Sequence, residues 1–145
     1  MVSITPKSLE ELVRIVGEVC GEFEECVYAL VFGSRATKTQ KPYSDLDVAV
    51  MFKGGTEKPL ELAQELAFKI EERTGVKVDV VPLNLADTIL RYEVFRDGIL
   101  AFCRDHNRYW DDKVNSVDKY LDFKRVLDRH YKRVVREIMD AASGR

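Results

Sequence analysis

Apolar and polar residues alternate along this chain in two rhythms, one typical of helices and one typical of strands. In the first segment apolar residues recur at the spacing of one helix face, and Thr5 precedes Pro6 as a candidate N-cap. We predict a helix over about residues 6–24. Two β-rich apolar runs follow, CVYALVFG ending at Gly33 and DLDVAVMF ending before a Gly-Gly turn. Each run predicts a buried strand.

The remaining chain continues this alternation. PLELAQELAFKIEERTG predicts a helix with Gly75 as its C-cap, and VKVDVVPL predicts a third strand. NLADTILRYEVFRDG predicts a helix capped by Asn84, and ILAFCR predicts a short fourth strand. From Asn115 on, the pattern predicts a long amphipathic helix. Its apolar side comprises Val117, Tyr120, Leu121, Val126, Leu127, Tyr131, Val134, Val135 and Ile138, with Lys124 among them.

This order of elements predicts an α/β (α+β) fold with a small mixed β-sheet flanked by helices. The sequence contains no repeat and no interdomain linker, so we expect residues 1–145 to form one domain. Its core is expected over about residues 6–103, followed by a C-terminal helical extension over about residues 105–142. The strand order is not fixed by the sequence alone.

Charge is unevenly distributed along the chain. The net charge is −2, but the segment from Lys113 onward carries +4 and the preceding part carries −6. The basic tail is either a surface for a partner or a phosphate, or simply a solvated helix face. A chain that is not broadly basic is not expected to bind nucleic acid directly.

Cysteine usage and hydropathy give an expected location. Cys20, Cys26 and Cys103 are odd in number and form no CxxC pair, which indicates neither a disulfide framework nor a zinc site. The first residues contain no apolar signal-peptide core, and no apolar run approaches the roughly 20 residues of a membrane span. We therefore expect reduced thiols, a cytoplasmic location and no membrane association.

The residues that suggest chemistry lie at the ends of the predicted strands. Gly33 and Ser34 end the first strand, Asp45 and Asp47 begin the second, and Asp79 lies within the third. If these strands are neighbours, the three carboxylates converge at one end of one sheet face. Carboxylate oxygens suit Mg²⁺, while a Gly-Ser turn lets backbone N–H groups approach a phosphate.

Each of these residues also has an ordinary interpretation. A Gly-Ser pair after a strand is commonly a turn, and Asp45 alone could simply start a strand. Asp79 is harder to explain in this way, because an aspartate among valines is costly to bury without a partner. Their combined spacing favours a functional site.

The motif resembles a known signature. The Gly-Ser pair, ten intervening residues and Asp-Leu-Asp resemble the DNA polymerase β-like nucleotidyltransferases, and Asp79 falls where that superfamily places its third carboxylate. The short chain resembles the minimal nucleotidyltransferase (MNT) branch. The resemblance covers about residues 27–81 by motif, and it implies the nucleotidyltransferase fold.

The resemblance also implies roles for individual residues. Asp45 and Asp47 would bind two Mg²⁺ ions that hold ATP, and Asp79 would complete the catalytic metal site and help to activate the acceptor hydroxyl. Gly33 and Ser34 would hold the β- and γ-phosphates. Arg35 could neutralise phosphate charge, although the motif does not require it. Lys38 and Lys41 could act similarly, but a solvated loop is the simpler interpretation.

Members of the MNT branch commonly act as antitoxins that adenylylate a tyrosine of a HEPN-family toxin. The resemblance therefore implies Mg²⁺-dependent transfer of AMP from ATP to a partner HEPN toxin. Two alternatives are an inactive module that neutralises its partner by binding, and an enzyme for a small molecule such as an aminoglycoside. A nucleic-acid polymerase is least favoured, because the chain is short. Whether the chain forms a homodimer stays open.

The last helix contains a second motif. Arg125, four residues and His130 resemble the Arg-x4-His signature of HEPN toxins themselves, but strands occupy the rest of this chain. We therefore predict a basic amphipathic helix with one exposed histidine. His106 is expected in a loop or at a helix start. Tyr109 and Trp110 are expected to pack the tail helix onto the core or to line a partner surface.

Overall fold

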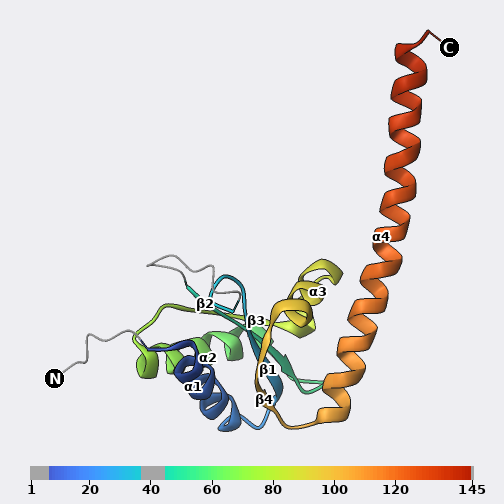
Figure 1. Ribbon diagram of the computed structural model, residues 1–145. Coiled ribbons are helices and arrows are strands. Elements are labelled where there is room, and N and C mark those ends of the chain that lie inside the picture. The colour runs from blue at the N-terminus through green and yellow to red at the C-terminus, as the bar shows by residue number, and fades with distance from the viewer. Residues whose placement is uncertain (1–6, 37–44, 145) are drawn as a thin grey trace.

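The computed structural model describes residues 7–36 and 45–144, so Thr5, Pro6, Lys38 and Lys41 lie outside the described residues. The described part of the chain forms a small body from which one long helix projects (Figure 1). The elements in chain order are α1 (Leu9–Gly21), β1 (Cys26–Phe32), β2 (Leu46–Phe52), α2 (Pro59–Thr74), β3 (Val78–Pro82), the 3₁₀ turn η1 (Leu83–Leu85), α3 (Thr88–Asp97), β4 (Ile99–Cys103) and α4 (His106–Ala142).

The four strands form one mixed sheet in the order β3-β2-β1-β4. Strand β1 is antiparallel to both β2 and β4, whereas β2 and β3 are parallel and are joined through α2. The predicted α+β architecture with a small mixed sheet is therefore confirmed, and the structure supplies the strand order.

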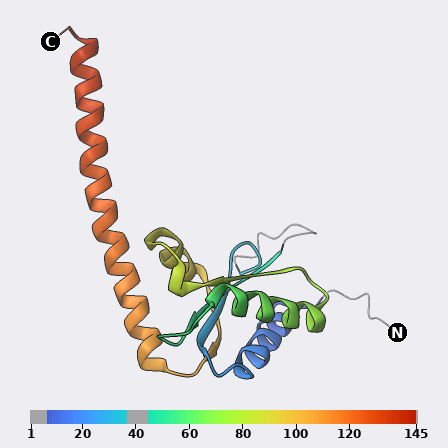
Figure 2. The same ribbon diagram turned by 180° about the vertical axis from the view of Figure 1, so that it is seen from behind.

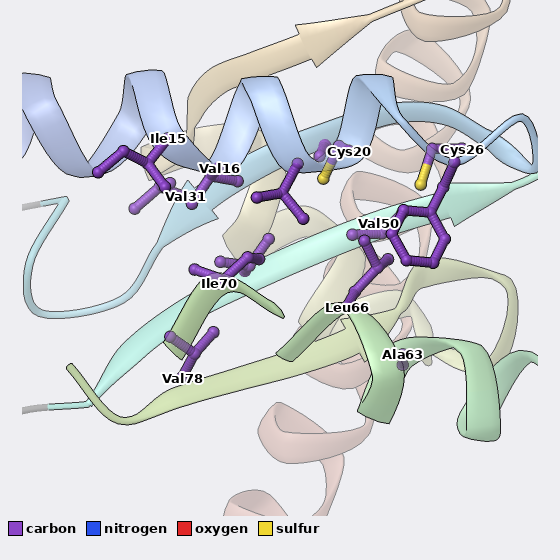
Figure 3. Packing of buried hydrophobic residues seen from close by; sticks show 14 of the residues in the cluster. Ile15, Val16, Cys20, Cys26, Val31, Val50, Ala63, Leu66, Ile70 and Val78 are labelled. Atoms are coloured by element: carbon purple, nitrogen blue, oxygen red, sulfur yellow. The ribbon is translucent and has the colours of Figure 1, made fainter. Parts of the chain in front are cut away.

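Each face of the sheet packs against its own pair of helices. Alternate strand residues such as Val31 and Val50 pack against α1 and α2, as the close view shows (Figure 3). The other alternate residues, including Tyr28 and Met51, pack against α3 and the first turns of α4. Both layers are visible when the molecule is turned (Figure 2). Period-two alternation thus divides most of the buried strand residues between two cores, apart from the register shifts near Tyr28 and Leu30 of β1.

The first and third predicted helices are shorter than expected. Helix α1 begins at Leu9, because the Ser8 side chain accepts a hydrogen bond from the Glu11 N–H (3.1 Å) and caps the helix there. It ends at Gly21 rather than near residue 24.

Asn84 is not the cap of the third predicted helix. It lies in η1, and its side chain accepts from the Phe52 N–H (2.9 Å) and donates to the Phe52 carbonyl (3.0 Å). The helix itself begins three residues beyond η1 and is capped by Asp87, whose carboxylate accepts from the Leu90 N–H (2.8 Å). Asn84 thus completes the hydrogen bonding at the end of β2, a long-range role that local periodicity does not reveal.

Helix α4 fills the whole predicted C-terminal extension. It begins at His106 and not at Asn115, because Asp105 caps it by accepting from the Arg108 N–H (3.1 Å). His106 is therefore at a helix start, as expected. No helix in the described part of the chain is both long and apolar enough to cross a membrane.

Two glycines of α1 provide a matched test of this packing. A Cβ on Gly17 would lie 2.3 Å from the Ala101 carbonyl oxygen of β4, whereas a Cβ on Gly21 would make ordinary contact with the Phe102 ring (3.5 Å). Replacing glycine by alanine within a helix normally gains about 1 kcal/mol. We expect Gly17→Ala to reverse that sign and lower the melting temperature by about 5 °C or more, because backbone atoms cannot yield.

The matched variant Gly21→Ala is expected to leave the melting temperature unchanged or slightly higher. Thermal unfolding followed by circular dichroism measures both variants under the same conditions. Equal melting temperatures for the two variants would contradict the close approach of α1 to β4.

Candidate active site

The candidate site is organised around the turn that follows β1. Gly33 has φ +78°, a left-handed conformation that glycine adopts most readily. A Cβ on Gly33 would lie 2.3 Å from the Asp47 Oδ2, so the Asp47 carboxylate packs directly against this glycine. Gly33 is therefore needed for its backbone angle and also to make room for Asp47. The sequence predicted a turn at Gly33 but not its contact with Asp47.

Strand pairing places the aspartates side by side. Asp47 lies opposite Phe32 of β1 and next to Asp79 in the parallel pairing of β2 with β3. Asp45 precedes Asp47 by two residues, so the alternation of an extended chain directs it to the same side. The expectation that these three residues share one end of one sheet face is consistent with this register.

The face that carries the aspartates is the one covered by α3 and α4. Ala49 and Met51 continue the Asp47 side of β2, and both belong to the core beneath α3 and α4. Met51 is buried and Asp47, nearer the start of β2, is half-buried, while Asp79 is exposed at the same register on the edge strand β3. The carboxylates therefore lie at the open end of this face, which α3 and α4 cover nearer the middle of the strands.

The electrostatics of Asp47 reflect this position. Burial raises the pKa of the Asp47 carboxyl above its ordinary value of 3.8, and the negative charges of Asp79 and Asp45 raise it further. The repulsion from Asp79 and Asp45 that opposes ionisation of Asp47 also favours a bound cation, whose charge would compensate all three carboxylates.

The donor set fits a hard divalent cation. Three carboxylates and no sulfur or imidazole offer the oxygen ligands that Mg²⁺ prefers. Within residues 7–36 and 45–144, however, no three His, Cys, Asp or Glu side chains lie close enough together to form a finished metal cage. Mg²⁺ usually takes only one or two carboxylates together with substrate phosphates and water, so an open set of this kind suits it.

The turn after the first strand holds the remaining predicted residues. Gly33 forms a bend, and Ser34 and Arg35 continue it as a turn at the end of β1. Register therefore places this turn beside the start of β2, next to Asp47. Their proposed contacts with phosphate stay a prediction.

The other singled-out residues lie on α4, away from the aspartates. Tyr109 is buried and packs edge-on against Tyr28, with ring centroids 5.3 Å apart, whereas Trp110 is 56% exposed. Tyr109 thus packs the helix onto the core as expected. His130 is exposed on the projecting part of α4, with the Arg133 guanidinium 3.1 Å from its Nδ1. The prediction of a basic helix with an exposed histidine is confirmed.

One contact that orients α4 was not predicted. The Tyr28 hydroxyl donates to the Asp112 Oδ2 (2.8 Å), and the Arg108 Nε also donates to that oxygen (2.9 Å). Burial, together with the Asp112 carboxylate, raises the pKa of Tyr28. A tyrosine within an otherwise apolar buried strand was the only sequence signal for it, because Tyr28 and Asp112 are 84 residues apart.

The sequence pattern of the family "Polymerase beta, Nucleotidyltransferase" matches residues 16–107, which is more than half of the chain. This chain belongs to the polymerase beta nucleotidyltransferase family. The match includes all four strands and the three aspartates. The chain is accordingly a nucleotidyltransferase, and the fold expected from the motif is confirmed.

Known relatives and solved structures agree with this assignment. The nucleotidyltransferase is 34% identical to a Methanocaldococcus jannaschii protein named "Putative protein adenylyltransferase". The matched segment covers 49% of this chain and 74% of that protein. A chain in the crystal structure of a toxin-antitoxin with AMP-PNP matches at 22% identity and a TM-score of 0.61, covering 91% of this chain and 96% of that chain.

A third similarity is to a chain from a structure of a tri-AMPylated Shewanella oneidensis HEPN toxin in complex with an MNT antitoxin. Its TM-score is 0.63 at 18% identity, covering 90% of this chain and 98% of that chain. At such low identities the two structural similarities establish the shared fold only.

The raised pKa of Asp47 leads to a stability prediction. The folded chain holds the Asp47 proton more tightly than the unfolded chain does, so stability falls as pH rises from about 3.8 through the raised pKa. We expect Asp47→Asn to be more stable than the wild type at pH 8 in Mg²⁺-free buffer. The difference should shrink as the pH is lowered toward 4.

Urea unfolding of both proteins between pH 4 and pH 8 measures this difference. Asp128→Asn, which changes an exposed aspartate on α4, serves as the control and should track the wild type at every pH. A wild type that is more stable than Asp47→Asn at pH 8 would contradict the repulsion among the three carboxylates.

Proposed function

We propose that this nucleotidyltransferase transfers AMP from ATP, in an Mg²⁺-dependent reaction, to a tyrosine hydroxyl of a partner HEPN toxin, and so acts as an antitoxin. The observation that carries the proposal is the parallel register of Asp47 with Asp79, together with Gly33 packed against the Asp47 carboxylate. Carboxylates held together against their repulsion need a cation, and a glycine turn beside them suits the phosphates that such a cation brings.

The residues divide the chemistry between them. Asp45 and Asp47 would hold the metal and ATP, while the turn of Gly33, Ser34 and Arg35 receives the β- and γ-phosphates. Bound Mg²⁺ supplies positive charge that neutralises the transferring and leaving phosphate oxygens. Asp79, the exposed carboxylate, completes the metal site and helps to remove the proton from the acceptor hydroxyl.

The reaction is an in-line displacement. The acceptor oxygen forms a bond to the α-phosphorus of ATP, the bond from that phosphorus to the bridging oxygen breaks, and pyrophosphate leaves. The hydroxyl proton passes to the Asp79 carboxylate, directly or through a water molecule. The protein's contribution is positioning and charge stabilisation, which are the main needs of phosphoryl-type transfers.

The comparisons support the choice of acceptor and donor. The relative from Methanocaldococcus jannaschii carries a name that specifies adenylyl transfer to protein. One chain of the same fold comes from a toxin-antitoxin structure with an ATP analogue, and another comes from a structure whose HEPN toxin is AMPylated. A protein hydroxyl and an adenine nucleotide are therefore favoured over a small-molecule acceptor.

The test is incubation with α-labelled ATP and Mg²⁺, with and without the protein encoded by the adjacent gene, followed by intact-mass analysis. We expect an increase of one AMP or more on the partner protein with the wild type. Asp47→Ala and Asp45→Ala should each reduce the rate by about 100-fold or more, the scale on which loss of one charge-stabilising group acts.

Metal dependence gives a separate readout. Millimolar Mg²⁺ should raise the melting temperature of the wild type, because the folded chain binds the ion and the unfolded chain does not, and it should leave Asp47→Ala unchanged. Full transfer activity in both alanine variants would refute the mechanism. A stable complex without any transfer would instead support a module that neutralises its partner by binding.

A further inference from the structure

One face of α4 continues from the core into solvent. Tyr109 and Ser116 are the buried residues of this helix, and Tyr120 stacks on Tyr92 of α3 with ring centroids 3.7 Å apart. In a helix of 3.6 residues per turn, positions seven and eleven residues beyond Tyr120 lie on this same face. These positions are Leu127 and Tyr131.

The continued face is apolar, and all of it but the half-buried Val134 is exposed. Leu127, Tyr131, Val134 and Ile138 recur at spacings of four, three and four residues. Leu127 is 48% exposed, Tyr131 70% and Ile138 63%. We call these four residues the inner stripe. An apolar stripe of this length on a helix that has left the body indicates a surface that another protein covers.

The free part of α4 extends past the end of the sheet that carries the aspartates. Helix α4 starts next to Tyr28, at the far end of β1, and passes α3 at Tyr92. Helix α3 runs in the same direction, toward the aspartate end of the sheet. It is followed by Gly98, which lies close to Leu30, and the next residue, Ile99, pairs with Val31. The roughly 33 Å of helix from residue 121 to 142 therefore rises beyond the open end of the site (Figure 1).

The helix and the aspartates belong to the same side of the sheet. Asp47 and Asp79 lie on the face that α3 and α4 cover. The inner stripe continues the face that α4 turns toward this core. A protein that lies against the inner stripe is consequently on the same side of the sheet as the carboxylates.

The charge of this segment selects the kind of partner. Residues 124–136 contain six lysines and arginines and one aspartate, a net charge of +5. Two copies paired along the inner stripe would bring two such segments to an interaxial distance of about 8–10 Å, within one Debye length. The charge thus disfavours a second copy and favours an acidic protein, whereas a nucleic acid would leave the inner stripe uncovered.

We propose that residues 121–142 form a docking arm for the protein acceptor: an acidic partner with an apolar surface packs on the inner stripe and is thereby presented to the carboxylate end of the sheet. This inference rests on the proposed function, because it assigns the surface that binds the acceptor of that reaction. The arm acts as a positioning element, and its residues take no part in the chemistry.

Two adjacent residues provide the test. Leu127 belongs to the inner stripe, whereas Val126 lies about 100° around the helix from it and is 61% exposed. Leu127→Glu and Val126→Glu thus make the same chemical change on exposed residues of one helix turn. The Mg²⁺-dependent rise in melting temperature should be the same in both variants as in the wild type, since neither residue lies near the aspartates.

The probe is the full-length protein encoded by the adjacent gene. Complex formation is measured by isothermal titration calorimetry, and AMP transfer is measured by intact mass. We expect Leu127→Glu to weaken binding at least ten-fold and to slow transfer at limiting acceptor, with little change at saturating acceptor. Val126→Glu should stay within two-fold of the wild type in both measurements.

The other outcomes separate this inference from the proposed function. Normal binding and transfer by Leu127→Glu would refute the docking arm and leave the proposed function intact. Binding that requires Leu127 but is followed by no transfer would support the arm and refute the proposed reaction. A wild type that neither binds nor modifies the probe would refute both.

Two further outcomes also count against the arm as proposed. Light scattering that shows a dimer lost in Leu127→Glu would mean that a second copy covers the inner stripe. Tight anisotropy-detected binding of a 30-nucleotide RNA, lost in Arg129→Glu and retained in Leu127→Glu, would mean that this helix recognises nucleic acid.

Discussion

The packing of the Asp47 carboxylate on Gly33 is the contact on which the rest of the site depends. It requires β1 and β2 to run close together at the point where β1 turns away, and only a residue without a Cβ permits this approach. Once Asp47 is held there, the parallel pairing with β3 places Asp79 next to it without further adjustment. A like-charged pair is thus fixed by backbone hydrogen bonds, which are insensitive to the repulsion between the side chains.

This arrangement explains why, at the start of β2, one face of the strand is fully buried and the other is not. Leu46 and Val48 flank Asp47 on the opposite face and are fully buried against α1 and α2. The two apolar residues anchor the start of β2, so the strand can carry an aspartate whose burial is unfavourable. Polar residues at functional sites commonly break local rules in this way, at a cost that the surrounding fold compensates.

Sequence periodicity was sufficient to predict the order of helices and strands, because that order depends on local spacing, whereas some helix ends were wrong. The Gly-Ser pair and the three aspartates were identified from their distances along the chain, and the register of β2 with β3 agrees with them. Long-range contacts were not accessible in this way. Asn84 looked like a helix cap but bonds to the backbone of Phe52, 32 residues away. The start of α4 was obscured because its first turns are polar on the outside and only Tyr109 and Ser116 are buried.

The direction of α4 links the fold to the recognition of a partner. The partly buried hydrogen bond from Tyr28 to Asp112 attaches the start of α4 to the sheet, and the stacking of Tyr120 on Tyr92 of α3 sets the direction of α4. An isolated helix has little support from its own propensity in water. A free helical segment that is apolar on one side and strongly basic overall therefore gains its full stabilisation only when a partner covers it. The carboxylate end of the sheet and the basic arm lie on the same side of the sheet. A nucleotide with its cation at the first and an acidic acceptor at the second would balance the charge of each.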